Sequence, residues 1–582
     1  MKIRSFDAIV VGTGAAGYNC ANRLKQLGKN VVIVTEGVNS GTSRNTGSDK
    51  QTYYKLNLAG SSADSVRNMA SDLFAGGSMD GDNALCEAAL SGRCFLNLCE
   101  LGVPFPTNRY GEFVGYKTDH DPYARATSAG PLTSKFMTEA LQKQAQALGV
   151  PVLDGYYATD ILKHDGKVCG LVCLHKGKLV ALRSNFVVLA TGGPAGIYEN
   201  VVYPVGHTGS TGLALRAGAK GQNLSLWQYG LASVAPRWNV SGTYMQVLPR
   251  FVSVDDNGTE HEFLLEHYGD AYKALSMVFL KGYQWPYDPR KAKDGSSVID
   301  LLVHEQCVKY GRRVYLDFTK NPFGLETVEF EKLSPEAYSY LEKAEACFGT
   351  PIERLQKMNT PAIELYRSKG VDISKEYLQI ALCAQHCNGG IGVDLWWQTE
   401  VPGLFCVGEC AGTHGIARPG GSALNAGQVG SLRAAQYIAK QPEQPVSAAD
   451  FAAAAQWVHY APKTGVDFEK KLTEARCRMS ACAGAVRDMA AMEKALEETK
   501  KELETIIWTA DIQSLRLRDA LVTQLAALTD MLQGDPDPKL VRQTAVSGSR
   551  CQCTARPVRP LPEDNDVFET VWRQYRENGN VF

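Results

Sequence analysis

The chain has 582 residues, too many for one compact core, so two to four structural units are expected. Hydrophobic residues make up 44% of it and charged residues 21%, which is typical of a globular protein rather than a disordered or fibrous one. The formal net charge of −1 provides no field that would hold nucleic acid or an acidic membrane surface. Both classes of partner are therefore disfavoured.

The N-terminus predicts neither export nor membrane insertion. The charged stub MKIRSFD runs directly into a strand, without the apolar segment and small-residue cleavage site of a secretory signal. No apolar stretch is long enough to span a bilayer. We therefore expect a cytoplasmic protein.

The 16 cysteines contain no C-x-x-C pair and no ladder that would hold an iron–sulfur cluster. We interpret them as reduced thiols that pack as small hydrophobes. No metal site is predicted. Any iron–sulfur cluster that exchanges electrons with this chain is expected on another chain.

The first 36 residues predict a βαβ unit that binds a dinucleotide. Strands are expected at Asp7–Val11 and Asn30–Thr35, with a helix at Tyr18–Leu27 between them. Glu36, nineteen residues after the last glycine of the turn, is positioned to accept hydrogen bonds from ribose hydroxyls. The turn lets the backbone approach a pyrophosphate at a helix N-terminus. Its predicted binding residues are Gly12, Gly14, Ala15, Ala16 and Gly17.

This motif alone does not separate NAD from FAD, but two later segments favour FAD. Phe186–Gly193 reads FVVLATGG, a buried strand with a tight turn, and Pro402–Cys410 reads PGLFCVGEC, a second strand that ends in Gly-Glu. One FAD needs separate loops for its pyrophosphate, ribityl chain and ring. The helix expected after Gly421 should direct its N-terminus at the flavin N1/O2 edge. The further FAD contacts predicted in these segments are Thr191, Gly192, Gly193, Glu409, Gly421, Ser422, Ala423 and Leu424.

The fold class predicted is α/β: a Rossmann-like FAD-binding domain with an inserted α+β capping domain and a C-terminal helical domain. The pattern between about 238 and 369 turns aromatic and charged, which indicates the insertion. Helical periodicity runs through Phe468–Trp508 and Ile512–Leu532. The predicted domains are 1–237 and 370–440 for FAD binding, 238–369 for the cap and 441–582 for the helical domain.

Together these segments resemble the flavoprotein subunits of succinate dehydrogenase and fumarate reductase, with their relatives L-aspartate oxidase and adenylylsulfate reductase. The resemblance implies hydride exchange between flavin N5 and a substrate carbon, with a proton moved on the neighbouring carbon. The resemblance also implies FAD contacts at Ser43, Asn45, Thr46 and Ala158. It is carried by GTGAAG, ATGGPAGIY, TGLALRAGA, VYLDF, VPGLFCVGECAGTHGIARPGGSAL at Val401–Leu424, MSACAGAVRD and RLRDAL.

Several positions depart from the family pattern. Members with covalent FAD carry a histidine where this chain has Asn45, so the FAD is expected to be non-covalent. Members that reduce dicarboxylates carry histidines where this chain has Gly230 and Gln385. Their T-E-G…G-E-G-G stretch is replaced by SGTYMQVLPRFVS. These differences predict a substrate other than succinate or fumarate.

Two arginines are the predicted catalytic residues. Arg418 matches the family arginine of H-G-x-x-R and presents a bidentate fork to a carboxylate or another oxyanion. The resemblance suggests Arg290 as the proton donor, although its surrounding motif differs. The alternative for each arginine is a structural clamp on backbone carbonyls. His386 and His414 are interpreted as hydrogen-bonding residues rather than catalysts.

The favoured function is FAD-dependent oxidoreduction of a small, anionic organic substrate, as C=C reduction or its reverse. One alternative is a flavoprotein subunit that exchanges electrons with a ferredoxin-like iron–sulfur protein, as in adenylylsulfate reductase. A second is an oxidase that resembles L-aspartate oxidase. A flavin-bearing binding or RNA-modifying protein is disfavoured by the near-zero charge.

Overall fold

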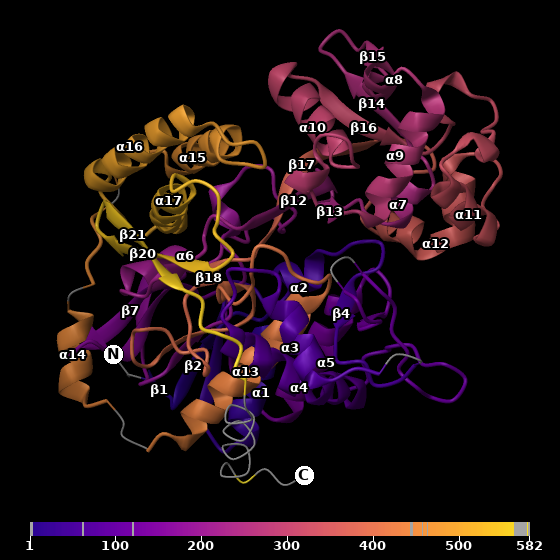
Figure 1. The fold of residues 1–582 in the computed structure, drawn as a ribbon. Coiled ribbons are helices and arrows are strands. Elements are labelled where there is room, and N and C mark those ends of the chain that lie inside the picture. The colour runs from indigo at the N-terminus through magenta and orange to yellow at the C-terminus, as the bar shows by residue number, and fades with distance from the viewer. Residues whose placement is uncertain are drawn as a thin grey trace.

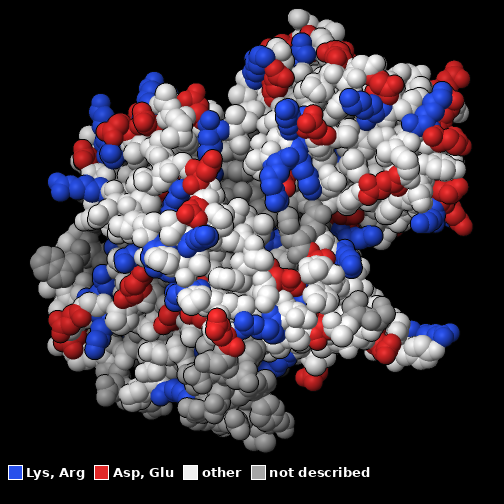
Figure 2. Space-filling model, in the orientation of Figure 1, with Lys and Arg blue, Asp and Glu red and all other residues white. Residues whose placement is uncertain are grey.

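The structure, a computed structural model, describes residues 4–60, 63–118, 121–442, 446–456, 458–462, 464–563 and 579. The first three residues of the N-terminal stub lie outside the described residues. Figure 1 shows a main body, a lobe formed by the middle of the chain, and a helical group on the other side of the body. On the face drawn in Figure 2, acidic and basic side chains are interspersed over all three parts.

The main body is built on a five-stranded parallel sheet with the order β19-β10-β2-β3-β6. Four of the strands, β19, β10, β2 and β3, are buried along their whole length, as expected of a parallel sheet covered by helices, whereas the edge strand β6 is partly exposed. This confirms the strands predicted at the start of the chain and in FVVLATGG and PGLFCVGEC. The bounds are β2 Ala8–Val11, β3 Val31–Thr35, β6 Val152–Asp154, β10 Val187–Leu189 and β19 Leu404–Cys406.

Helices α1 (Ala15–Gln26) and α13 (Ser422–Lys440) pack together beside this sheet. Asn19 Nδ2 donates to the Gln428 carbonyl at 3.0 Å, and Ser431 Oγ donates to the Ala16 carbonyl at 2.8 Å. A Cβ atom at Gly17 would lie 2.1 Å from the Gly12 carbonyl oxygen, so only glycine allows α1 to lie this close to its preceding turn. Two helices whose contacting residues are 409 positions apart in the sequence thus pack directly against each other.

Smaller elements surround this core. An antiparallel sheet has the order β1-β9-β8-β7, and β4 pairs with β5. These strands are β1 Arg4–Ser5, β4 Thr52–Tyr54, β5 Ala126–Ser128, β7 Tyr157–His164, β8 Lys167–His175 and β9 Lys178–Arg183. The remaining helices of the body are α2 Thr42–Asn45, α3 Val66–Phe74, α4 Gly81–Glu100, α5 Thr133–Ala147, α6 Thr211–Arg216 and α14 Ala448–Ala455.

The inserted lobe, called the cap here, has a six-stranded sheet with the order β13-β12-β17-β16-β14-β15 and its own hydrophobic cores. Two neighbouring strands of this sheet, β12 (Trp227–Ser233) and β17 (Leu378–Cys387), lie wholly outside the range 238–369 and connect the cap to the body. The other strands are β13 Trp238–Asn239, β14 Arg250–Val254, β15 Glu260–His261 and β16 Arg313–Asp317. The helices are α7 Thr243–Gln246, α8 Phe263–Tyr268, α9 Ala271–Tyr283, α10 Val298–His304, α11 Pro335–Lys343 and α12 Pro351–Ser368.

The C-terminal part contains the predicted helices, as α15 (Phe468–Cys482), α16 (Met489–Thr505) and α17 (Ile512–Met531). It also contains a hairpin that the sequence analysis did not anticipate, formed by β20 (Leu540–Ser547) and β21 (Arg550–Pro557). The hairpin pairs with β11 (Gly221–Gln222), which pairs with β18 (Gly390–Ile391). The pairing attaches the end of the chain to the body. Among the described residues, none of the helices combines the length and the apolar character needed to cross a bilayer.

Candidate active site

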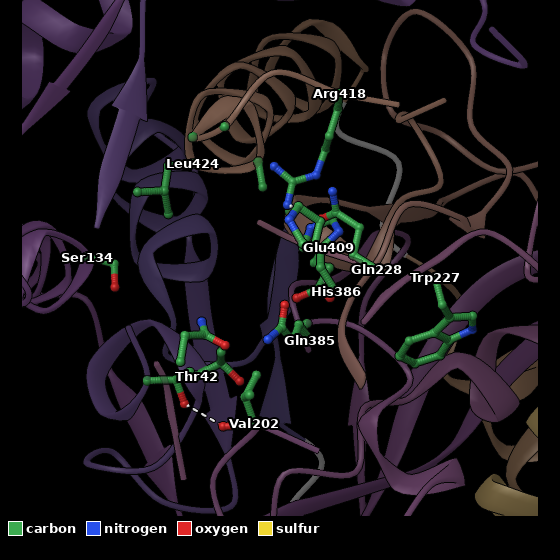
Figure 3. Close-up of a pocket in the computed structure, with 18 of the residues that line it drawn as sticks. Thr42, Ser134, Val202, Trp227, Gln228, Gln385, His386, Glu409, Arg418 and Leu424 are labelled. Atoms are coloured by element: carbon green, nitrogen blue, oxygen red, sulfur yellow. Dashed lines mark hydrogen bonds and ion pairs between the residues drawn. The ribbon is translucent and has the colours of Figure 1, made fainter. Parts of the chain in front are cut away.

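A cavity of about 2070 Å³ lies where the body, the cap and the C-terminal helices meet. It is larger than the roughly 300–1,000 Å³ of an ordinary ligand pocket, so it has room for a cofactor together with a substrate. The predicted turn after β2 and the segments after β3, β10 and β19 all line it. Figure 3 shows Gln385, His386, Glu409 and Arg418 in its interior, with Trp227 to one side.

The turn between β2 and α1 forms a cradle for an anion. Gly12 has a φ of +113°, and a Cβ atom there would lie 2.4 Å from the Ala190 carbonyl oxygen. The N-cap residue of α1 is Gly14, which has no side chain that could bond the N–H groups of the first turn. The N–H of Ala15 donates to Ser43 Oγ at 3.3 Å. The helix therefore directs its first N–H groups and its positive end at the cavity.

The acid predicted to contact ribose lies at the same end of the cavity. Glu36 follows β3, and its Oε2 is 2.7 Å from Arg516 Nη2 on α17. Arg516 also lines the cavity. The C-terminal helices therefore contribute directly to the dinucleotide end of the site, which the sequence analysis did not predict.

Glu409 lies further along the cavity, just after β19. Its Oε1 accepts hydrogen bonds from the Tyr203 hydroxyl and from Cys387 N, the latter at 3.1 Å. A Cβ atom at Gly193 would lie 2.4 Å from this oxygen. The absence of a side chain at Gly193 therefore provides the space that the Glu409 carboxyl occupies. Burial raises the pKa of the Glu409 carboxyl to about 7, despite the hydrogen bond from Tyr203.

His207, which belongs to none of the predicted motifs, supports the Thr-Gly-Gly turn after β10. Gly192, with a φ of +73°, would direct a Cβ atom to within 2.5 Å of the His207 ring. The ring bonds Thr42 Oγ1 at 2.8 Å and the Gly193 carbonyl at 3.3 Å. Burial lowers the pKa of His207 to about 4, so it is neutral near pH 7. A neutral ring with both nitrogens bonded acts as a support for the loops.

Arg418 is held by neutral partners. Its Nε donates to Asn388 Oδ1 at 3.1 Å, and its Nη2 donates to Gln228 Oε1 at 2.7 Å. No carboxylate of the described chain lies within 4.0 Å of its guanidinium nitrogens. Burial lowers the pKa of Arg418 to about 10, so the group remains a cation at neutral pH.

The groups around Arg418 leave its charge under-compensated. Burial raises the pKa of Glu87 to about 8, so near pH 7 this carboxyl is largely protonated, and Glu409 is only partly ionised. The pKa values of His386 and His414 lie well below their usual range because of burial first and of Arg418 second. Both rings are therefore neutral near pH 7. A desolvated cation with mainly neutral neighbours is a strong site for an incoming anion.

The loop that carries Arg418 is fastened to the body. Ile416 N and Ala417 N donate to the carbonyls of Gly77 and Gly76, at 2.9 Å and 3.1 Å. Asn388 Nδ2 donates to the Gly415 carbonyl at 2.8 Å. The guanidinium is thus pre-positioned rather than free to swing.

The predicted site residues divide by position. Gly12, Gly14, Ala15, Ala16, Glu36, Ser43, Thr46, Ala158, Thr191, Gly192, Glu409, Arg418, Gly421, Ala423 and Leu424 line the cavity. Gly17, Asn45, Gly193 and Ser422 lie behind its wall. Asn45 Nδ2 donates to the carbonyls of Asn39 and Gly41, at 2.9 Å and 3.0 Å, within its own turn.

Arg290 differs from Arg418. It lines the cavity from the cap side, but its side chain is 72% exposed, and its Nη2 is paired with Asp288 at 2.8 Å. Asp288 keeps the pKa of Arg290 above its usual value. The structure therefore brings both arginines to one cavity, one in the desolvated interior and one at an exposed wall.

Many other cavity residues were not predicted as site residues, among them Gln228, Trp285, Arg487 and Arg516. Arg487 and Arg516 fall in the family-like segments MSACAGAVRD and RLRDAL, which is the only signal the sequence carried for them. Among the described residues, no group of His, Cys, Asp and Glu could hold a metal ion.

The glycine cradle, the acid after β3 and the helix N-termini are donor and acceptor groups that fit FAD. Fold and cavity together are those of a dinucleotide-binding protein with room for a second ligand. The profile of the FAD binding domain family matches residues 7–424, and the chain belongs to that family. It is an FAD-dependent oxidoreductase, and the predicted resemblance to flavoprotein subunits is confirmed.

Curated relatives agree with this assignment, and a solved structure shares the fold. L-aspartate oxidase of Bacillus subtilis (strain 168) is 25% identical over 74% of this chain and 72% of its own. The succinate dehydrogenase flavoprotein subunit of Rickettsia felis is 25% identical over 76% of this chain and 72% of its own. The structure of Mycobacterium smegmatis Sdh1 in complex with UQ1 superimposes with a TM-score of 0.71 at 20% identity, covering 99% of this chain and 98% of that one.

We predict that the purified protein is yellow and that acid denaturation releases its FAD into the supernatant. The residue in the covalent-linkage position is an amide, and it is bonded within its own turn instead of facing the cavity. The measurement is flavin absorbance in supernatant and pellet after precipitation. Flavin that stays with the washed polypeptide would contradict the prediction.

Proposed function

We propose that the protein exchanges hydride between FAD and a small organic anion, reducing an activated C=C bond or running the reverse, and that the substrate is neither succinate nor fumarate. The observation that carries the proposal is Arg418, a desolvated cation on the cavity wall without a carboxylate partner among the described residues. When bound, FAD supplies or accepts the hydride. The chain's own residues bind the anion, orient it and keep water away.

Arg418 would bind the substrate oxyanion with the guanidinium N–H groups that Asn388 and Gln228 leave available. A guanidinium has five N–H donors, and these two partners use only one each. The charge also favours electron density that moves toward the oxyanion when hydride adds to the neighbouring C=C bond. The fixed loop gives this effect without reorganisation during the reaction.

The proton for the neighbouring carbon needs a second group, and Arg290 of the cap is proposed for it. It lines the same cavity, and the pairing with Asp288 keeps it protonated. Its exposure means that a closer approach of the cap to the body would be needed to desolvate it. This role rests on the resemblance and on the shared cavity.

We predict that Arg418→Ala lowers kcat/KM because a charged bidentate contact in a closed site is lost. The decrease should correspond to a loss of about 2–4 kcal/mol of transition-state stabilisation. The substrate is the compound that best bleaches or restores the flavin absorbance in an anaerobic screen. FAD content and melting temperature should change little, and Arg418→Lys should rescue poorly since lysine lacks the fork. A purely structural role predicts lost flavin and lowered melting temperature instead. Full activity in the alanine variant would remove Arg418 from the mechanism.

We also propose that electrons come from another protein, a ferredoxin-like iron–sulfur partner. The sequence has one dinucleotide-type glycine motif, already assigned to FAD, and no cysteine ladder. We therefore predict that a reduced viologen or ferredoxin reduces the flavin quickly under anaerobic conditions, whereas NADH alone does so slowly. The measurement is stopped-flow flavin bleaching. Reduction by NADH alone at catalytic rates would contradict the proposal.

A further inference from the structure

The dinucleotide end of the cavity is completed by a residue from the C-terminal part of the chain. Arg516 on α17 lines the cavity, and its Nη2 donates to Glu36 Oε2 at 2.7 Å, across 480 positions of sequence. In the part of the chain that the structure describes, no other group bonds this carboxyl. Arg516 therefore holds one oxygen of Glu36 and leaves the second oxygen to a ligand.

The pair faces the cavity instead of a closed core. The side chains of Arg516 and Glu36 are 19% and 35% exposed, and both line the cavity. Val205 lines the same cavity and is 87% exposed. It precedes Gly206, where a Cβ atom would lie 3.9 Å from Arg516 Nη2. A cofactor that reaches from the glycine turn to Glu36 would cover these side chains.

Two further residues of α17 fasten the helix to the body beside Arg516. Arg518 Nη2 lies 3.2 Å from Asp160 Oδ1 on β7, and Asp519 Oδ1 accepts from Leu213 N at 2.7 Å. The helix also packs against α6, as Figure 1 shows. Neither Arg518 nor Asp519 lines the cavity. They fix the position of the helix, and Arg516 extends from it to the cofactor end.

Arg516 affects both the charge and the orientation of Glu36. Burial raises the pKa of the Glu36 carboxyl, and the neighbouring Arg516 opposes this rise. An ionised carboxylate accepts hydrogen bonds from hydroxyl groups more strongly than a neutral acid does. A guanidinium bonded to one oxygen also fixes the plane of the carboxylate. The pair is thus a preorganised acceptor for neighbouring hydroxyls.

We propose that Arg516 is a positioning residue for FAD. It orients the Glu36 carboxylate toward the 2′- and 3′-hydroxyls of the adenosine ribose, so the complete cofactor site requires the docked C-terminal helices. The inference concerns cofactor binding and is independent of the proposed reaction. If Arg516 served only as a fastening between domains, its loss would weaken docking without changing the preference for a ribose hydroxyl.

The test measures nucleotide binding to the full chain after removal of FAD. ADP carries the adenosine and pyrophosphate of FAD without the flavin, and 2′-deoxy-ADP lacks one of the two ribose hydroxyls. Dissociation constants are measured by calorimetry, so the readout does not depend on enzyme activity. We expect ADP to bind about ten-fold more tightly than 2′-deoxy-ADP, because the deoxy compound loses a hydrogen bond to a charged acceptor.

Arg516→Gln removes the charge and retains a polar side chain. It should weaken the binding of ADP and FAD about ten-fold and reduce the preference for ADP to about two-fold or less. Arg516→Lys should restore part of the preference, since lysine keeps the charge but not the fork. In a Glu36→Gln background, Arg516→Gln should have little further effect, because the two residues act as one unit.

Arg518→Gln is the matched control. It removes an arginine of the same helix that pairs with a carboxylate of the body but does not line the cavity. We expect a lower melting temperature, because a contact between α17 and β7 is lost, with the preference for ADP over 2′-deoxy-ADP unchanged.

Three results would overturn the inference. The unaltered protein could bind 2′-deoxy-ADP as tightly as ADP, Arg516→Gln could retain the full preference, or Arg518→Gln could reduce the preference as much as Arg516→Gln does. If Arg516→Gln does not fold, Arg516→Lys takes its place, and an undiminished preference in that variant would equally overturn the inference.

Discussion

The site depends on one electrostatic constraint, the desolvated guanidinium of Arg418 surrounded by neutral hydrogen-bond acceptors. Removing a cation from water is costly unless a counter-charge compensates it. Asn388 and Gln228 bond the guanidinium but do not neutralise it. Burial keeps Glu87 largely protonated and His386 neutral near pH 7. The compensating charge is therefore expected to arrive with the ligand.

The rest of the architecture positions that cation and encloses the space beside it. The parallel sheet brings the turns after β2, β10 and β19 to one end of the sheet, where a dinucleotide can span them. The cap reaches the cavity through the Trp285 segment, and α17 reaches it through Arg516. Every large unit of the chain thus contributes to one cavity, so substrate binding, flavin binding and cap position are physically linked.

The features that sequence predicted are those encoded by short local patterns. The glycine turn at Gly12 and the strand before Glu409 are local, and Arg418 stands in a fixed motif after it. The residues that sequence missed depend on contacts between distant segments. The sequence around Gln385 does not predict the β-bulge at this residue, and the sequence around Trp285 does not predict that its side chain lies beside Gly230. The absence of a histidine at 230 was visible in the sequence, but the indole beside it was not. The hairpin after α17 was missed because its partner, β11, lies more than three hundred residues earlier.

The central claim is that Arg418 binds a substrate anion. A crystal structure of the FAD-loaded protein with the best compound of the anaerobic screen bound tests it most directly. The account predicts the carboxylate or other oxyanion of the substrate within hydrogen-bond distance of the Arg418 guanidinium. A carboxylate bound elsewhere, with Arg418 still bonded only to Asn388 and Gln228, would contradict it.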